Sequence, residues 1–229
     1  MTSNSILLIG ASRGLGHAMA AEFVAKGWHV TGTVRGADRT KLHDLRDLHP
    51  DRVEIEALDI TRPEEIAALK TRLSGRRFDM LFVNAGITNA NPSETIGETA
   101  TEEFIRVMVT NALSPMRVVE GLEDLVSPEG LIGVMSSGQG SIANNLKGGL
   151  EVYRGSKAAL NQYMRGYAAR RPERALVLVA PGWIRTDLGG PGAPFTMEET
   201  IPKIVATLVG RMGEVGLRYL DREGKDVPW

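Results

Sequence analysis

The sequence predicts an α/β protein built on one doubly wound parallel sheet. Short runs of β-branched and aliphatic residues alternate with longer segments of helical periodicity along the whole 229-residue chain. This alternation is typical of βαβ units whose sheet is buried on both faces. The length suits one large domain, and 42% hydrophobic residues suffice for a sizeable core. We therefore predict a single domain spanning residues 1–229.

Strands are predicted where short apolar runs lie between turn residues, and helices where apolar residues recur at helical spacing. The expected strands are Ser5–Ile9, Trp28–Val34, Val53–Ala57, Met80–Asn84, Leu131–Ser136 and Leu176–Ala180, with a weak final strand near Leu217–Leu220. The expected helices are Gly14–Lys26, Pro63–Leu73, Thr101–Leu125 and Glu151–Arg170, followed by a less sharply bounded segment around Ile201–Arg211. Ligands of such sheets bind at the carboxyl ends of the strands, so the loops that follow these strands are the candidate sites.

Composition narrows the possible functions. Lys and Arg total 27 against 28 Asp and Glu, so no basic field attracts nucleic acid or an anionic membrane, and we expect a small-molecule partner. Cysteine is absent, which excludes disulfides and thiolate metal sites and suits a reducing compartment. No metal site is predicted. No apolar stretch approaches the roughly 20 residues that span a bilayer, and no export signal is evident, so a cytoplasmic protein is expected.

A glycine-rich turn follows the first strand, in the segment Gly10-Ala11-Ser12-Arg13-Gly14-Leu15-Gly16. Backbone amides at the start of the next helix can face a pyrophosphate there, whereas a Cβ would hold the phosphates away. The turn predicts a Rossmann-type dinucleotide site, with a purely structural tight turn as the alternative. The expected cofactor contacts are Gly10, Ser12, Arg13, Gly14, Leu15 and Gly16.

Two other interpretations of this turn fail. The pattern Gly10-x-Ser12-x-Gly14 also matches the nucleophile elbow of α/β-hydrolases, but that fold needs a histidine well downstream, and the last of the four histidines is His49. A P-loop would need Lys after the last glycine, where His17 stands.

The end of the second strand indicates which nicotinamide cofactor binds. It reads Thr33-Val34-Arg35, with no carboxylate to hold the ribose diol of NAD. Arg35 and Arg13, with Arg39 as a further candidate, offer cations instead, and a guanidinium can bind a 2′-phosphate through paired hydrogen bonds. We predict NADP(H). Ordinary solvated arginines are the alternative.

A candidate acid/base pair starts the helix expected at Glu151–Arg170. Tyr153 and Lys157 are four residues apart, so they lie on one helix face. A nearby ammonium stabilises a phenolate, and it would lower the pKa of Tyr153 from about 10 toward neutrality, where proton exchange with a substrate oxygen is efficient. This spacing also arises by chance, so the motifs elsewhere in the chain decide whether the pair is catalytic.

The motifs taken together resemble the short-chain dehydrogenase/reductase family over essentially the whole chain. They are Gly10-x-x-x-Gly14-x-Gly16, Asn84-Ala85-Gly86, Asn111, Ser137, Tyr153-x-x-x-Lys157 and Pro181-Gly182. The resemblance implies Tyr153 as general acid/base, Ser137 as hydroxyl donor to the substrate oxygen, and Lys157 as ligand of the nicotinamide ribose. Asn111 would hold a water that relays protons to Lys157. The neighbouring Ser136 remains an alternative to Ser137.

The same resemblance implies further contacts. Asp59 and Ile60 would flank adenine, although an Asp at a strand end is also a common helix N-cap. Asn84 could instead be a turn residue, and Asn111 an ordinary polar position on a helix. The remaining expected cofactor contacts are Asn84, Ala85, Gly86, Pro181, Gly182, Ile184 and Thr186. The expected substrate contacts are Ser137, Gln139 and Trp183, although a Trp at a strand end is at least as often a packing residue.

The sequence departs from the usual family pattern at two places. Ile9 stands where the family usually has Thr, so a hydroxyl that ties the glycine turn to the sheet is missing. Ser137 and Tyr153 are three residues farther apart than the commonest spacing, and the longer loop, with Gly148-Gly149, should reshape the substrate cleft. With the segments at 181–187 and 226–229, this loop is similar to the C-factor and sniffer-type carbonyl reductase subgroup.

The resemblance implies an NADPH-dependent reductase that converts an aldehyde, ketone or quinone to an alcohol. The alternative is a nucleotide-binding signalling or regulatory protein with little turnover. A sugar-nucleotide epimerase would need a larger C-terminal substrate domain. Residues 187–212 are predicted to form a substrate lid. A homodimer through the helices at 101–125 and 151–170 is expected, with a monomer as the alternative because relatives with a longer loop ahead of the tyrosine include monomers.

Overall fold

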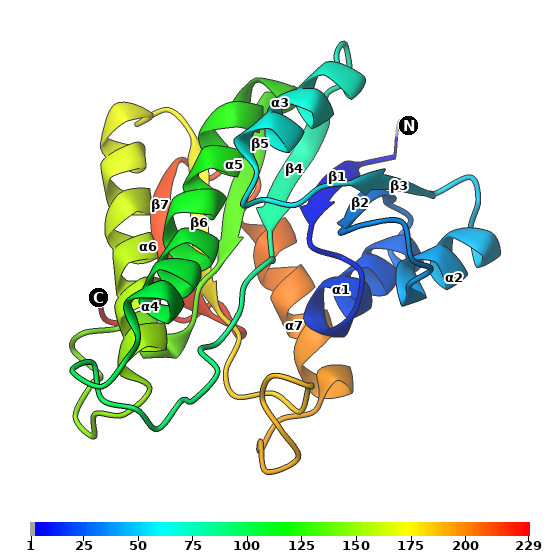
Figure 1. Cartoon of the computed structure of the whole chain (residues 1–229). Coiled ribbons are helices and arrows are strands. Elements are labelled where there is room, and N and C mark those ends of the chain that lie inside the picture. The colour runs from blue at the N-terminus through cyan, green and yellow to red at the C-terminus, as the bar shows by residue number, and fades with distance from the viewer. Residues whose placement is uncertain (1–2) are drawn as a thin grey trace.

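The computed structural model describes residues 3–229 and contains one seven-stranded parallel sheet (Figure 1). Its strands are β1 (Ser5–Ile9), β2 (His29–Val34), β3 (Val53–Ala57), β4 (Phe78–Val83), β5 (Val126–Met135), β6 (Ala175–Ala180) and β7 (Gly216–Asp221). They lie in the order β3-β2-β1-β4-β5-β6-β7. The winding direction reverses between β1 and β4, which is where ligands of doubly wound sheets bind. This topology confirms the predicted Rossmann-type α/β fold.

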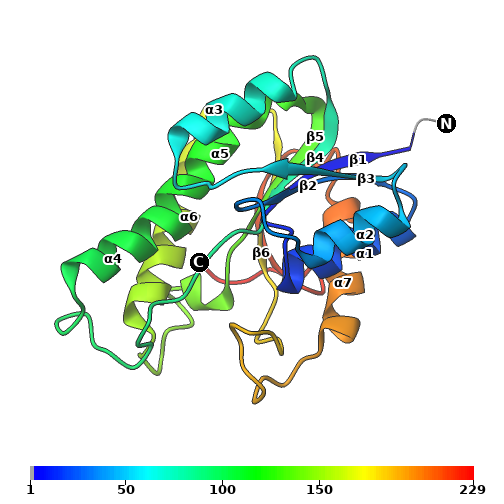
Figure 2. The ribbon, with the colours of Figure 1, turned by 45° about the vertical axis from the view of Figure 1, so that its right-hand side comes forward.

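Helices cover both faces of the sheet. One layer consists of α1 (Gly14–Ala25), α2 (Lys41–Leu48) and α7 (Met197–Gly210), and the other of α3 (Pro63–Arg72), α4 (Thr101–Met108), α5 (Ser114–Leu122) and α6 (Glu151–Arg170). Figure 2 shows the two layers on opposite sides of the strands. No helix within residues 3–229 is long and apolar enough to cross a bilayer.

The core explains why the strands are almost wholly apolar. All six residues of β6 are buried, and successive side chains point to opposite faces of the sheet. Leu176 and Leu178 pack with α3, α5 and α6, whereas Val177 and Val179 pack with α1 and α7. A strand covered on both faces needs apolar residues at every position, and this produces the continuous runs seen in the sequence.

Two elements differ from the sequence-based expectation. Helix α2 was not predicted, because only Leu42 and Leu45 of its eight residues are buried and the rest read as a polar loop. The single helix expected over residues 101–125 is four segments: α4, the π-helix η1 (Val109–Leu113), α5 and the 3₁₀ turn η2 (Glu123–Leu125). The π-helix contains Asn111, and such turns occur frequently at functional sites.

The predicted lid region needs a correction. Residues 197–210 form α7, whose Ile201, Ile204 and Leu208 are buried against the sheet. Thr196 begins this helix with a capping box to Glu199. A core helix does not open and close over a cleft, so any lid is confined to the loop that ends at Thr196.

Three long loops gather at one end of the sheet. They follow β4 (residues 84–100), β5 (136–150) and β6 (181–196). All three extend from the lower end of the molecule in Figure 1, beyond the carboxyl ends of the strands. This is the edge at which the sequence places the candidate site.

Candidate active site

The glycine turn between β1 and α1 is packed too tightly for side chains. A Cβ on Gly10, whose φ is +86°, would lie 2.9 Å from the backbone of Ala85. A Cβ on Gly16 would lie 2.0 Å from the carbonyl oxygen of Gly10. Asn84 strengthens this packing, because its Nδ2 donates to the same carbonyl oxygen at 2.9 Å. The turn and the start of the loop after β4 therefore form one rigid unit.

Thr33 on β2 supplies the hydroxyl that Ile9 lacks. The amide of Gly10 donates to Thr33 Oγ1 at 2.9 Å, and the amide of Ala11 donates to the Thr33 carbonyl oxygen at 2.8 Å. The glycine turn is thus tied to the sheet from the neighbouring strand. Sequence analysis missed Thr33, although a polar residue in a buried strand was a signal.

The cations near the glycine turn differ in whether they are exposed or already bound to acidic side chains. A pocket of about 520 Å³ beside the glycine turn is lined by Ser12, Arg13, Arg39, Thr40, Lys41 and Asp44. Arg39 is already paired, because its guanidinium lies 2.7 Å from Asp44 and 2.6 Å from Asp47. Lys41 and Arg13 are exposed at the same pocket, and Arg35 is exposed nearby at the end of β2. Lys41 belongs to no motif, so sequence analysis missed it.

Asp59, at the end of β3, is held in an ionised state. Its Oδ1 accepts hydrogen bonds from the amide and the hydroxyl of Thr61, at 2.9 and 2.7 Å. Partial burial raises the pKa of Asp59, but these hydrogen bonds and the charges of Arg35 and Arg62 outweigh it and lower the pKa below its usual value. The carboxylate closes a turn ahead of α3. Neighbouring Ile60 is 5% exposed, with its side chain in the core.

Asn111 is fully buried and connects three segments. Its Oδ1 accepts from the amide of Ile87 at 2.9 Å, and its Nδ2 donates to the Ile87 carbonyl oxygen at 2.8 Å. The same Nδ2 donates to Ser156 Oγ, on α6, at 3.0 Å. The side chain thus joins the π-helix to the loop after β4 and to the helix that carries Tyr153. An ordinary polar surface position on a helix would show none of these contacts.

Lys157 is buried beside Tyr153. It is 4% exposed, and its Nζ donates to the Met135 carbonyl oxygen at 2.9 Å. Burial lowers the pKa of Lys157 to about 8. The Nζ lies 5.9 Å from the centre of the Tyr153 ring. A Cβ on Gly86 would lie 3.3 Å from Asn111 Oδ1 and 3.4 Å from Lys157 Nζ, so these two groups flank a glycine.

The expected lowering of the Tyr153 pKa is not found. Burial raises the pKa of Tyr153 above its ordinary value, and the Ser137 hydroxyl only partly opposes this effect. The cost of desolvating a phenolate outweighs the effect of a neighbouring ammonium on this pKa. Tyr153 is consequently protonated at neutral pH, which is the form of a proton donor.

Ser136 and Ser137 have different surroundings. Ser136 is buried, and its hydroxyl donates to Asn161 Oδ1 at 2.6 Å. Ser137 is partly exposed, and its Oγ accepts from the Gln139 amide at 3.2 Å. Its carbonyl oxygen accepts a hydrogen bond from the Tyr219 hydroxyl of β7, a contact that sequence analysis missed. The geometry favours Ser137, not Ser136, as the hydroxyl that faces Tyr153.

The remaining predicted residues lie in the loops that follow β5 and β6. Gln139 Oε1 is buried and has no hydrogen-bond partner within residues 3–229. Trp183 is 59% exposed, and its Nε1 donates to the Gly189 carbonyl oxygen at 2.7 Å. Thr186 Oγ1 accepts from the amide of Gly189 at 3.0 Å. Pro181 and Ile184 are buried, and Gly182 has a φ of +92°.

Burial of Lys157 predicts a pH dependence of folding stability. The pKa of Lys157 is about 8 in the folded protein, against 10.5 for a free side chain. Below pH 8 both states are protonated, and the folded state bears the full cost of the buried charge. Above pH 8 the folded state loses this proton first, so the Lys157 contribution to the free energy of unfolding should rise by about 2 kcal/mol by pH 10.

Denaturant unfolding at pH 7 and pH 10 tests this expectation. The parent is compared with Lys157→Met, which keeps the length of the side chain but cannot titrate there. The free energy of unfolding of the parent minus that of the variant should rise by about 2 kcal/mol from pH 7 to pH 10. A constant difference would contradict the lowered pKa of Lys157.

Comparison with known proteins gives the same assignment. Residues 4–193 match the short chain dehydrogenase family. The C-signal protein of Myxococcus xanthus is 32% identical over 166 residues, which are 71% of this chain and 99% of that protein. A short-chain dehydrogenase/reductase from Burkholderia multivorans, crystallised with bound NADP, is 60% identical with a TM-score of 0.98, and the match covers all of both chains. Carbonyl reductase Sniffer of D. melanogaster is 27% identical with a TM-score of 0.86, also over both whole chains. The chain belongs to the short-chain dehydrogenase/reductase family.

Proposed function

We propose that this protein reduces a carbonyl group, in an aldehyde, ketone or quinone, to an alcohol at the expense of NADPH. The observation that carries the proposal is the grouping of Ser137, protonated Tyr153 and buried Lys157 beside a glycine turn, at the carboxyl end of the sheet. The name of Sniffer, a carbonyl reductase, supports the same reaction.

The residues around the glycine turn fit NADP. Backbone at Gly10 and Gly16 leaves no room for side chains, and α1 directs its N-terminal amides to this turn, as pyrophosphate binding requires. Arg13, Lys41 and Arg35 would hold the 2′-phosphate. The NADP-bound Burkholderia relative supports this assignment. When bound, NADPH would supply the hydride.

The side chains would assist the reaction in distinct ways. Ser137 would donate a hydrogen bond to the carbonyl oxygen and stabilise the negative charge that develops there. Tyr153 would deliver its phenolic proton to the same oxygen. The cation of Lys157 would stabilise the tyrosinate left behind. Asn111 would hold a water through which protons reach Lys157, and it braces α6 through Ser156.

Cofactor preference should change when Arg35 is replaced by Asp. The substitution removes a cation beside the proposed 2′-phosphate position and adds repulsion. We expect the ratio of NADPH to NADH affinity to fall by about tenfold or more. Fluorescence titration of both reduced cofactors measures this ratio.

The matched control is Lys70→Asp, the same charge reversal on α3, where Lys70 pairs with Asp124 on the surface. It should leave the ratio unchanged. A parent that binds NADH as tightly as NADPH, or an unchanged ratio in Arg35→Asp, would show that Arg35 does not select the cofactor.

The reaction itself is tested with a panel of aldehydes, ketones and quinones. Loss of reduced-nicotinamide absorbance with NADPH should reveal turnover of at least one class, with the alcohol product identified by mass spectrometry. A parent that binds NADPH but reduces none of them would favour the second candidate, a nucleotide-binding signalling or regulatory protein. The similarity to C-signal supports that candidate, whereas the intact Asn111, Ser137, Tyr153 and Lys157 oppose it.

We also propose that the chain forms a homodimer through α4 and α6. Large apolar side chains are exposed along these helices and the π-helix between α4 and α5: Phe104, Ile105, Leu113 and Tyr163. Burying them between two copies would remove apolar surface from water. Analytical ultracentrifugation of the parent and of Ile105→Lys tests this proposal.

A further inference from the structure

The loop between β6 and α7 forms a structure closed on itself, and we call residues 183–196 the flap. A β-bridge pairs Ile184, near its start, with Phe195, near its end. Within it, Trp183 Nε1 donates to the Gly189 carbonyl oxygen at 2.7 Å. Figures 1 and 2 show the flap extending past the sheet between β6 and α7. Because its two ends are joined, the flap can shift as one piece.

Two side chains from outside the flap contact it. Exposed Arg13 lies 3.8 Å from exposed Asp187, and the less exposed Arg222 contacts the C-terminal end of the flap. The Arg222 guanidinium carbon lies 3.7 Å from the centre of the Phe195 ring. The guanidinium also lies close to Gly182, the residue before the flap, because a Cβ there would lie 2.9 Å from a terminal guanidinium nitrogen of Arg222 and 3.3 Å from the Phe195 ring. The Arg222 side chain is only 20% exposed, so its cation–π contact is partly shielded from water and correspondingly stronger.

Arg222 is itself held firmly from the opposite side. Its carbonyl oxygen accepts a hydrogen bond from Thr207 Oγ1, on α7, at 3.1 Å. Its guanidinium lies 3.8 Å from Glu223, whose carboxylate also accepts from Lys203 at 3.1 Å and Lys225 at 3.0 Å. Hydrogen bonds from Lys225 and Lys203 lower the pKa of Glu223 to about 2. This carboxylate is therefore ionised at neutral pH.

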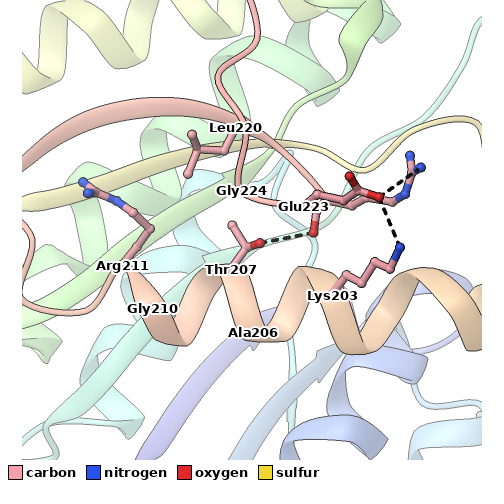
Figure 3. Close-up of a pocket in the computed structure, with 9 residues that line it drawn as sticks. Lys203, Ala206, Thr207, Gly210, Arg211, Leu220, Glu223 and Gly224 are labelled. Carbon is pink, nitrogen blue, oxygen red and sulfur yellow. Dashed lines mark hydrogen bonds and ion pairs between the residues drawn. The ribbon is translucent and has the colours of Figure 1, made fainter.

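Figure 3 shows how these groups are arranged around a groove of about 540 Å³ between α7 and the turn that follows β7. The marked contacts join Glu223 to Lys203 and to the Arg222 guanidinium, and Thr207 to the carbonyl oxygen of Arg222. Arg211 points away from them at the other end. The turn is thus anchored on a core helix, and Arg222 projects from a fixed base to the flap.

We propose that Arg222 is a positioning residue that holds the flap over the active site. The inference rests on the proposed function and on the contacts that the family resemblance implies, of Thr186 with the cofactor and of Trp183 with the substrate. Losing the Arg222 contact would free the flap and shorten the time for which both ligands stay bound. The proton and hydride transfer step would be unaffected, because Tyr153 and Lys157 are held by α6 and β5.

Stopped-flow fluorescence of NADPH release, without substrate, is the first test. Arg222→Ala should accelerate release roughly three- to thirtyfold, the range that a cation–π contact of this kind supports. KM for the carbonyl should rise, whereas the single-turnover rate at saturating substrate should match the parent. Arg222→Lys keeps a cation and should restore part of the effect. The matched control is Arg218→Ala, on β7 just ahead of the turn that carries Arg222, which removes an exposed ion pair with Asp226.

Phe195→Leu provides the second variant, because it keeps an apolar side chain but removes the ring. It should accelerate release as Arg222→Ala does, and the double variant should be no faster than either single one. Fully additive effects, or unchanged release in Arg222→Ala, would show that the flap is not held by this contact.

Limited trypsin digestion separates this inference from the proposed function. The flap contains the exposed cleavage site Arg185. In cofactor-free protein, Arg222→Ala should speed cleavage after Arg185, whereas Arg218→Ala should not. This result would stand even if the parent reduced no carbonyl. Equal cleavage rates in all three proteins would overturn the role of Arg222 whatever the enzyme does.

Discussion

Ser137→Ala is expected to lower kcat/KM for carbonyl reduction by about 10²-fold while leaving NADPH affinity unchanged. The hydroxyl of Ser137 faces Tyr153 and accepts a hydrogen bond from the Gln139 amide. It is therefore available to donate to a substrate oxygen. The loss should appear mainly in kcat, because charge develops on that oxygen as the hydride arrives.

Ser136→Ala is the matched control, one residue away. Its hydroxyl already donates to buried Asn161, so it holds β5 to α6. Removing it should reduce the free energy of unfolding by about 1 kcal/mol and leave turnover of the folded protein near the parental value. A large loss of turnover in Ser136→Ala with a parental Ser137→Ala would move the substrate contact by one residue.

The sheet was predictable because its central strands are buried on both faces. Continuous apolar runs such as β6 are distinctive, and the strand ends then locate the loops that carry function. Helix α2 was not predictable in this way, because its burial depends on Leu42 and Leu45 alone. The π-helix could not be predicted either, because it accompanies a hydrogen bond between Asn111 and Ile87, which are far apart in the sequence.

The candidate site was predictable where a motif is local. The glycine turn, Tyr153 and Lys157 each belong to a short segment whose spacing reflects one turn or one helix face. Thr33, Tyr219 and Arg222 act through contacts between distant segments. The pKa of Tyr153 could not be predicted from the sequence for the same reason. The neighbouring Lys is visible in the sequence, whereas the burial that raises the pKa is produced by the whole fold.

Tyr153→Phe should separate binding from chemistry more clearly than any other substitution. The variant loses only the phenolic oxygen, so the ring still packs and Ser156 still donates to the residue's carbonyl oxygen. The glycine turn and Lys157 are untouched, and NADPH affinity should remain parental. Turnover should fall by about 10²–10⁴-fold, because water would have to replace a positioned acid.

The same variant distinguishes the two candidate functions. If the protein is a reductase, NADPH affinity measured by fluorescence titration will be unchanged in this variant. Turnover with an accepted carbonyl will be nearly lost. Near-parental turnover in Tyr153→Phe would exclude Tyr153 as the proton donor. For a signalling protein that only binds the nucleotide, the phenolic oxygen would be dispensable, so an unchanged biological response in Tyr153→Phe cells would favour binding over catalysis.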